Sequence, residues 1–119
     1  MPNTPTAENI AVEICNNGAE AKKLIERQKF DLIISDEEMP LLTGSELAEW
    51  FRTEGGNTTT PFVIVSGKQD SQLFGNLMSK NLINVMIPKP FQYLPFINII
   101  YTLLGIQNDP AFKTSRKKN

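Results

Sequence analysis

Short apolar runs alternate along this chain with longer segments whose apolar residues recur at helical spacing. Continuous apolar runs close at Asp36 and at Ser66, and between them Leu47, Ala48 and Phe51 mark one face of a helix. This alternation is typical of βαβ units, in which helices cover a parallel sheet. The pattern therefore predicts an α/β fold.

Four strands are expected. Two continuous apolar runs predict central strands, at 32–34 closed by Asp36 and at 62–65 closed by Ser66. Residues 10–15 alternate between two faces and predict an edge strand, and residues 84–87 predict a last short strand.

Four helices are expected between and after these strands. Their predicted positions are residues 19–28, a segment that starts near Ser45 and stops before the Gly55 and Gly56 pair, residues 71–80 and residues 92–104. The last of them is apolar around most of its circumference, so it is expected to need burial on more than one side.

Length and composition indicate one soluble domain. The 119 residues suffice for a single hydrophobic core, and 40% apolar with 21% charged residues is typical of a globular protein. Residues 1–9 carry neither a basic start nor an apolar stretch, so we expect a cytoplasmic protein without membrane insertion. The predicted domain covers residues 10–106, between a disordered segment at 1–9 and a basic tail at 107–119.

The numbers of cysteine and histidine residues exclude several kinds of chemistry. Cys15 is the one cysteine and histidine is absent, which rules out an internal disulfide, a multi-cysteine metal site and catalysis by serine or cysteine with histidine. The net charge of -1 argues against nucleic acid as a partner, and the basic tail is expected to be a solvated chain end.

Three polar residues follow the predicted central strands. Asp36 ends one strand, Ser66 ends the next, and Lys89 comes after the last. Because ligands gather outside the carboxyl ends of parallel strands, these side chains can share a pocket. A carboxylate can attack a phosphoryl donor, while a hydroxyl and an ammonium stabilise the added charge. Each residue alone is more often a turn, cap or surface residue, but their joint placement favours phosphoryl transfer.

Four segments carry a resemblance to a known family, namely CNNGAEAKKLI, FDLIISDEEMPLLTGSEL, PFVIVSG and IPKPF. Their order and spacing resemble the receiver domains of two-component response regulators, over residues 10–104. The resemblance implies a flavodoxin-like parallel sheet with flanking helices. It also implies a phosphorelay protein that is not an enzyme and that takes a phosphoryl group from a histidine kinase.

The resemblance assigns roles to single residues. It implies that Asp36 is the phosphoacceptor, Ser66 the switch hydroxyl and Lys89 the residue that pairs with the phosphate, with a cis bond before Pro90. The family usually has an aromatic residue three positions before the lysine, where this chain has Met86. Met86 is better explained as a core methionine that fills an irregular gap, so the output switch is expected to differ from that of the family.

The sequence does not match the N-terminal part of the family's fold. Receivers resembling it begin with a strand ending in an acidic pair, then a helix, so we expect a truncated receiver that lacks this first β-α unit. Mg²⁺ would keep only the carboxylate of Asp36 and the backbone carbonyl of Glu38 as matching ligands, so its binding is expected to be weak or partner-dependent. The side chains of Glu37 and Glu38 are expected to be solvated.

The unmatched strand lies inside the family's 2-1-3-4-5 strand order, so a gap is expected beside the strand that ends at Asp36. Either the predicted edge strand closes the gap or another chain fills it, and the last helix keeps uncovered apolar surface. We therefore predict a homo-oligomer or a partner that completes the sheet. A histidine kinase or phosphotransfer protein and an effector are the further partners that the resemblance implies.

Two other functions stay open beside the phosphoaccepting receiver. A pseudo-receiver would act as a protein-interaction module without phosphorylation, and the missing acidic pair favours it. A phosphatase-like hydrolase would use Asp36 as its nucleophile, but no second general acid or base is evident. The leading prediction is a receiver with impaired Mg-dependent phosphorylation.

Overall fold

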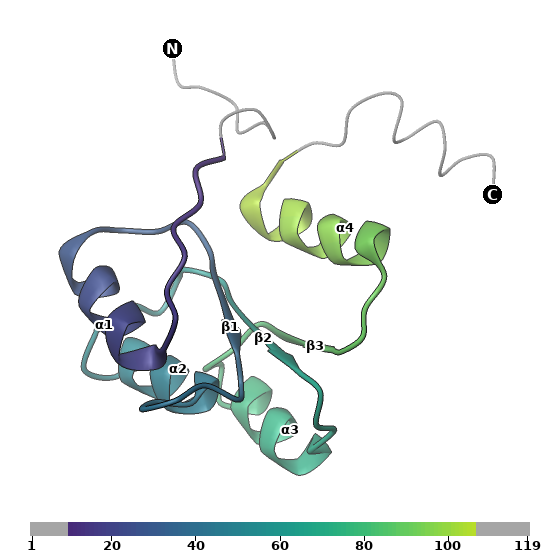
Figure 1. The fold of residues 1–119 in the computed structure, drawn as a ribbon, viewed down its shortest axis with the longest axis horizontal. Coiled ribbons are helices and arrows are strands. Elements are labelled where there is room, and N and C mark those ends of the chain that lie inside the picture. Colours follow the sequence, from purple (N-terminus) through teal and green to yellow (C-terminus); the bar gives the residue numbers. More distant parts are fainter. Residues whose placement is uncertain (1–9, 107–119) are drawn as a thin grey trace. The chain divides into compact units, whose positions relative to one another are not determined.

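The computed structural model describes residues 10–106, which fall into two units. The larger unit is residues 13–91, and the described part of the smaller unit is residues 10–12 and 92–106. Figure 1 shows the elements along the chain. The predicted disordered start at 1–9 and the predicted basic tail at 107–119 lie outside the described residues.

Helices and strands alternate through the larger unit. They are α1 (Gly18–Arg27), β1 (Ile33–Asp36), α2 (Gly44–Arg52), β2 (Phe62–Ser66), α3 (Ser71–Ser79) and β3 (Val85–Pro88), and the smaller unit contains α4 (Tyr93–Leu104). All four predicted helices and three of the four predicted strands are present. The α/β class is confirmed.

The three strands form one parallel sheet in the order β1-β2-β3. All five residues of β2 are buried, as expected of the central strand of a sheet. Ile34 of β1 lies opposite Val63, and Val63 lies opposite Val85 of β3. This register brings the carboxyl ends of the strands to one edge of the sheet.

Residues 10–15 do not form a strand, so the predicted edge strand is wrong. A strand needs a neighbour that accepts and donates ladder hydrogen bonds, and alternation of side chains cannot supply that neighbour. Within the described residues the sheet ends at β1, so the first of the two expected alternatives, in which residues 10–15 close the gap, does not occur.

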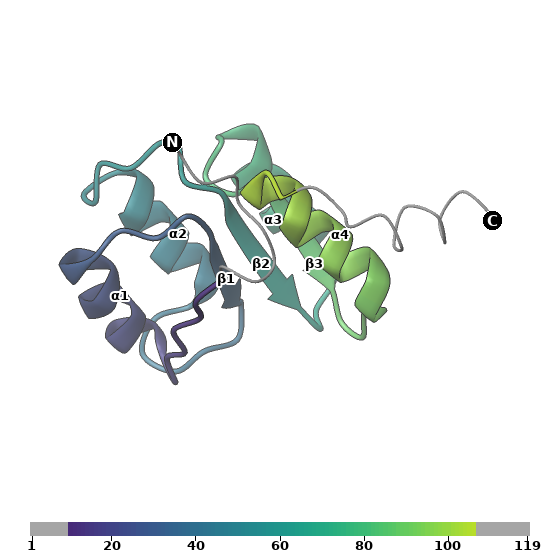
Figure 2. The same ribbon diagram turned by 90° about the horizontal axis from the view of Figure 1, so that it is seen from above.

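One face of the sheet is packed by helices. Phe62 and Ile64 of β2 point to the same face and join a core cluster with Leu47 and Phe51 of α2 and Phe74 of α3. Helix α1 adds partly buried side chains to this cluster, and Figures 1 and 2 show α1 beside α2. Burial of these large side chains is the main stabilisation of the larger unit.

Helix α2 starts at Gly44, close to the predicted position at Ser45. Its N-cap is Thr43, whose side chain accepts from the backbone N–H of Glu46 while the Glu46 carboxylate accepts from the N–H of Thr43. This reciprocal pair satisfies two N–H groups that the helix itself leaves free. Ser45 is thereby released for another contact, described below.

The smaller unit contributes one apolar helix. Helix α4 ends at Gly105, whose φ of 73° is a left-handed conformation that glycine adopts without strain. Ile100 is buried, whereas Tyr93 and Leu94 are exposed. Between residues 10 and 106, no helix combines the length and the apolar character needed to cross a membrane.

Candidate functional site

Asp36, Ser66 and Lys89 lie at the carboxyl ends of three neighbouring strands. Asp36 is the last residue of β1, Ser66 is the last residue of β2, and Lys89 directly follows β3. The backbone N–H of Lys89 donates to the carbonyl of Ser66 at 2.8 Å. Parallel pairing therefore brings these sequence-distant residues to one edge of the sheet.

Asp36 and Lys89 form an ion pair. The distance from Lys89 Nζ to Asp36 Oδ1 is 2.6 Å, and the side chains of Lys89 and Asp36 are 43% and 48% exposed, respectively. Such a half-exposed pair contributes about 1 kcal/mol or less to stability. Its larger consequence is chemical, because it places a cation against the carboxylate. The peptide bond between Lys89 and Pro90 is cis.

Ser66 is fully buried at the neighbouring strand end. Its hydroxyl donates to Glu38 Oε2 at 2.9 Å and accepts from the backbone N–H of Lys68 at 3.0 Å. Glu38 is exposed, as expected of a solvated side chain, but one of its oxygens also accepts from this buried hydroxyl. No local sequence signal announces this contact, since Glu38 and Ser66 lie on different strand ends.

Glu37 also makes a contact that the sequence did not predict. Its carboxylate accepts from the backbone N–H of Ser45 at 2.8 Å and from the hydroxyl of Ser45. A carboxylate in the first turn of a helix is favoured by the free N–H groups and the dipole there. Glu37 is partly buried and connects the loop after Asp36 to α2, so the expectation that its side chain is solvated is wrong.

Gly44 fixes the approach of this loop to the strand end. A Cβ at this position would lie 2.5 Å from the carbonyl oxygen of Asp36, so any side chain would push the two apart. The N–H of Gly44 also donates to the carbonyl of Glu37 at 3.1 Å. The first residue of α2 therefore sets the position of Asp36.

Met86 lies on β3 opposite Ile64 and packs, partly buried, against the core cluster. It fills the core as a flexible apolar side chain does.

The described residues do not by themselves make a magnesium site. Between positions 10 and 106, no group of three or more aspartate, glutamate, cysteine or histidine side chains is placed to hold a metal ion. The carboxylates of Glu37 and Glu38 are engaged by Ser45 and Ser66, and Asp36 is paired with Lys89. Mg²⁺ needs near-octahedral oxygen ligands, including one or two available carboxylates.

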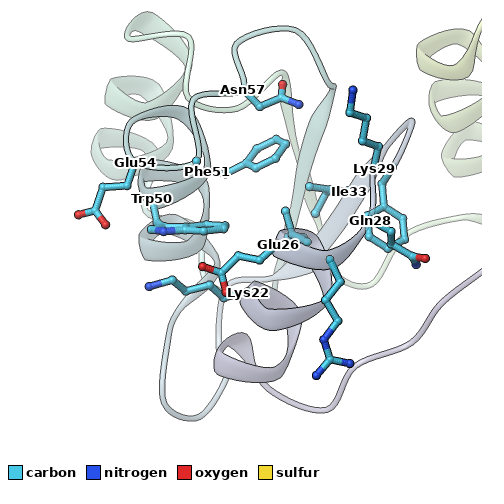
Figure 3. A pocket seen from close by; sticks show the side chains of 13 residues that line it. Lys22, Glu26, Gln28, Lys29, Ile33, Trp50, Phe51, Glu54 and Asn57 are labelled. Carbon is cyan, nitrogen blue, oxygen red and sulfur yellow. The ribbon is translucent and has the colours of Figure 1, made fainter.

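The larger unit has one cleft next to the strand ends and a second hollow that is distant from them. A cleft of about 460 Å³ is lined by Glu37, Glu38 and Lys68 among others, next to the strand ends. A hollow of about 770 Å³ lies between α1 and α2, where Lys22 Nζ sits 5.1 Å from the centre of the Trp50 ring (Figure 3). The second hollow contains none of the predicted site residues.

The chain is similar to a known protein family and to several solved structures. The profile of the response regulator receiver domain matches residues 3–100. The hybrid signal transduction histidine kinase K of Dictyostelium discoideum is 32% identical over 94 residues, which are 70% of this chain and 7% of that protein. The curated relatives matched here are thus much longer, and the chain spans 27% of their length or less.

Two solved receiver domains share the fold. The signal receiver domain of a histidine kinase from Syntrophus aciditrophicus is 25% identical with a TM-score of 0.70, covering 82% of this chain and 73% of that one. The receiver domain of a sensor histidine kinase from Pseudomonas aeruginosa, solved with a magnesium ion in its active-site cleft, is 22% identical with a TM-score of 0.68, covering 80% and 77%.

Proposed function

Because the chain belongs to the response regulator receiver domain family, we propose that Asp36 accepts a phosphoryl group from a histidine kinase or a phosphotransfer protein. The observation that supports this proposal most is the 2.6 Å contact between Asp36 and Lys89. The carboxylate is half exposed, so a donor can reach it. The ammonium beside it can take up the negative charge that arrives.

The proposed reaction moves one phosphoryl group. A carboxylate oxygen of Asp36 attacks the phosphorus of a phosphohistidine, forming a P–O bond while the P–N bond breaks and its electron pair returns to the imidazole. The product is an acyl phosphate on Asp36. Lys89 exchanges its contact with the carboxylate for one with a phosphoryl oxygen, which stabilises the charge of the transition state.

Ser66 is the proposed switch in this scheme. Its buried hydroxyl now donates to Glu38 and would donate to a phosphoryl oxygen after transfer. Such an exchange frees Glu38 and shifts the loop after β2, which an effector protein then recognises. Met86 would change the output relative to an aromatic residue, because a methionine has no ring to reorient.

Magnesium is the part of the family's chemistry that these residues support least. The P. aeruginosa receiver domain holds a magnesium ion in its cleft. In this chain we propose that Asp36 and the backbone carbonyl of Glu38 bind Mg²⁺ weakly, or only when a partner adds carboxylates. Phosphorylation is accordingly proposed to be slow.

The direct test is incubation with Mg²⁺ and acetyl phosphate, followed by intact-mass measurement. We expect the mass increment of one phosphoryl group in the natural chain and none in Asp36→Asn. Asp31→Asn is the matched control, because Asp31 is an exposed aspartate at the opposite end of β1. An equal increment in Asp36→Asn would refute the assignment of Asp36.

A pseudo-receiver is the second candidate function. The absence, between residues 10 and 106, of a cluster of three or more acidic side chains placed to hold a metal ion favours it. In that case the chain would be a protein-interaction module, and the mass increment would be missing even at high donor concentration.

We propose for both candidates a cytoplasmic protein that is not an enzyme in its own right, that binds protein partners rather than nucleic acid, and whose sheet is completed by a second copy or another partner. A kinase and an effector are the proposed partners of the phosphoaccepting receiver.

A further inference from the structure

The buried hydroxyl of Ser66 already gives its proton to Glu38. Ser66 is 0% exposed, and its Oγ donates to Glu38 Oε2 at 2.9 Å. The same Oγ accepts from the backbone N–H of Lys68 at 3.0 Å. Because a hydroxyl carries a single proton, Ser66 cannot donate fully to Glu38 and to another acceptor at the same time. Any other anion that needs this proton therefore competes with Glu38.

The loop after β1 holds Glu38 in place through the residue before it. The N–H of Glu37 donates to the carbonyl of Val65 at 3.0 Å, which continues the pairing of β1 with β2. The carbonyl of Glu37 accepts from the N–H groups of Met39 and Gly44, both at 3.1 Å. Because both backbone groups of Glu37 are bound, the next residue is kept close to the buried hydroxyl. The contact is thus supported by the backbone of the loop.

The two partners differ in how easily they can part. Glu38 is exposed and borders the cleft of about 460 Å³ beside the strand ends, so its carboxylate has space to turn and water to accept from. Ser66 is buried, and a buried hydroxyl without an acceptor costs free energy. Ser66 therefore gives up Glu38 when another acceptor reaches it.

We propose that the Glu38 carboxylate restrains phosphorylation of Asp36, because it occupies the Ser66 hydroxyl until a phosphoryl oxygen displaces it. This inference rests on the proposed function, in which Asp36 takes up the phosphoryl group and Ser66 donates to it. Glu38 acts through Ser66, so it is a positioning residue and makes no contact with the phosphoryl group itself.

The rate of phosphoryl incorporation tests the restraint. With acetyl phosphate at a fixed Mg²⁺ concentration, Glu38→Ala is expected to incorporate roughly 5- to 10-fold faster than the natural chain, since one hydrogen bond to a charged group no longer has to be exchanged. The backbone carbonyl at position 38 is kept in this variant. Glu54→Ala is the control, because Glu54 is an exposed glutamate outside the cleft. An equal or slower rate in Glu38→Ala overturns the inference.

Glu38→Gln separates the hydrogen bond from the negative charge. Glutamine keeps an oxygen that can accept from Ser66, but it has no charge to repel an incoming phosphoryl group. Its hydrogen bond is weaker than that of the carboxylate, so incorporation is expected to be only about 2- to 3-fold faster than in the natural chain. A rate as high as that of Glu38→Ala would mean that charge repulsion alone slows the reaction, and would overturn the inference.

The restraint also requires that Glu38 and Ser66 act as a pair. In Ser66→Ala there is no hydroxyl to occupy, so adding Glu38→Ala to this variant is expected to leave the rate of incorporation unchanged. A purely structural role of Glu38 would give the same increase with and without Ser66, and that result overturns the inference.

Nuclear magnetic resonance tests the contact without phosphorylation. The N–H of Lys68 donates to Ser66 Oγ, so its amide signal is expected to shift in Glu38→Ala and to stay in place in Glu54→Ala. An unmoved Lys68 signal in Glu38→Ala would overturn the inference.

The inference and the proposed function fail in different ways. Incorporation on Asp36 at one rate in the natural chain and in Glu38→Ala would leave the proposed function intact and overturn the inference alone. Absence of incorporation from all of these chains would overturn the proposed function, and the inference with it.

Discussion

Strands β1 and β2 are neighbours in one sheet, yet their surroundings differ sharply. Every residue of β2 is buried, and β2 is paired on both sides. In β1, by contrast, Ile34 is 45% exposed and the outer backbone edge is free within the described chain. Packing at the centre of the sheet is complete, whereas packing at this edge leaves room for another segment.

The functional site shows the same division. The half supplied by β2 and β3 is well determined, with Ser66 buried and hydrogen-bonded and Lys89 held against Asp36. In the half beside β1, the carboxylates of Glu37 and Glu38 already accept hydrogen bonds from Ser45 and Ser66. The comparison teaches that the half of the site proposed to bind phosphate is formed by the described chain, whereas residues 10–106 contain no cluster of three or more acidic side chains placed to hold a metal ion.

The largest expected effect compares two isoleucines in the two strands. Ile64 of β2 is fully buried and Ile34 of β1 is half exposed. Ile64→Ala is expected to lower the free energy of unfolding by about 2–5 kcal/mol, because it leaves a cavity in the core. Ile34→Ala is expected to cost about 1 kcal/mol or less. Urea unfolding of both variants measures the difference, and equal losses would show that β1 is not a free edge.

A second prediction concerns the phosphate-binding half. Lys89→Gln removes the cation beside Asp36 and is expected to slow phosphoryl incorporation about 100-fold, as loss of one charge-stabilising donor does in other active sites. Its effect on stability is expected to stay within about 1 kcal/mol. Time-resolved intact-mass measurement gives the rate. Lys80→Gln, at an exposed lysine that ends α3, is the control, and matching rates for the two variants would contradict the role of Lys89.

The reciprocal hydrogen bonds between Thr43 and Glu46 at the start of α2 predict a smaller effect on stability. Thr43→Ala removes the side-chain acceptor for the N–H of Glu46 and is expected to cost about 1 kcal/mol. Ser45→Ala should leave the cap intact while it loses the hydroxyl contact to Glu37. If thermal unfolding showed Ser45→Ala to be the only destabilised variant of the two, Thr43 would not be the cap.

The smallest expected effect concerns the reactivity of the Cys15 thiol. Burial, followed by the negative charges of Glu20 and Glu13, raises the pKa of the Cys15 thiol. A raised pKa means less thiolate at neutral pH, so alkylation by iodoacetamide should be several-fold slower in the folded chain than in urea. Glu20→Gln should speed the reaction slightly. Equal rates in the folded and the urea-unfolded chain would argue against this environment for Cys15.

Much of the fold could be predicted because its signals are local. Apolar runs closed by Asp36 and Ser66 mark strands, and helical spacing of Leu47 and Phe51 marks α2, so each element carries its own evidence. The strand predicted at residues 10–15 was wrong for the opposite reason. Its side chains alternate correctly, but a strand also depends on a neighbour, and the sequence of the segment does not report whether one is there.

The site could be predicted only in part for a related reason. Asp36, Ser66 and Lys89 were selected by their position at strand ends, which a parallel sheet brings together. The contacts of Glu37 with Ser45 and of Glu38 with Ser66 depend on how one loop is folded. Adjacent glutamates in a loop look solvated in sequence, and only the folded loop shows that Glu37 is partly buried against Ser45 while Glu38 stays exposed.

The measurement that tests the central claim most directly is phosphoryl incorporation on Asp36 as a function of Mg²⁺ concentration. If the described chain forms the phosphate-binding half of the site and not the metal-binding half, incorporation should occur, should be lost in Asp36→Asn, and should keep rising with Mg²⁺ through the millimolar range without saturating. Saturation at micromolar Mg²⁺ would contradict the account, because it would require a complete set of metal ligands within this chain.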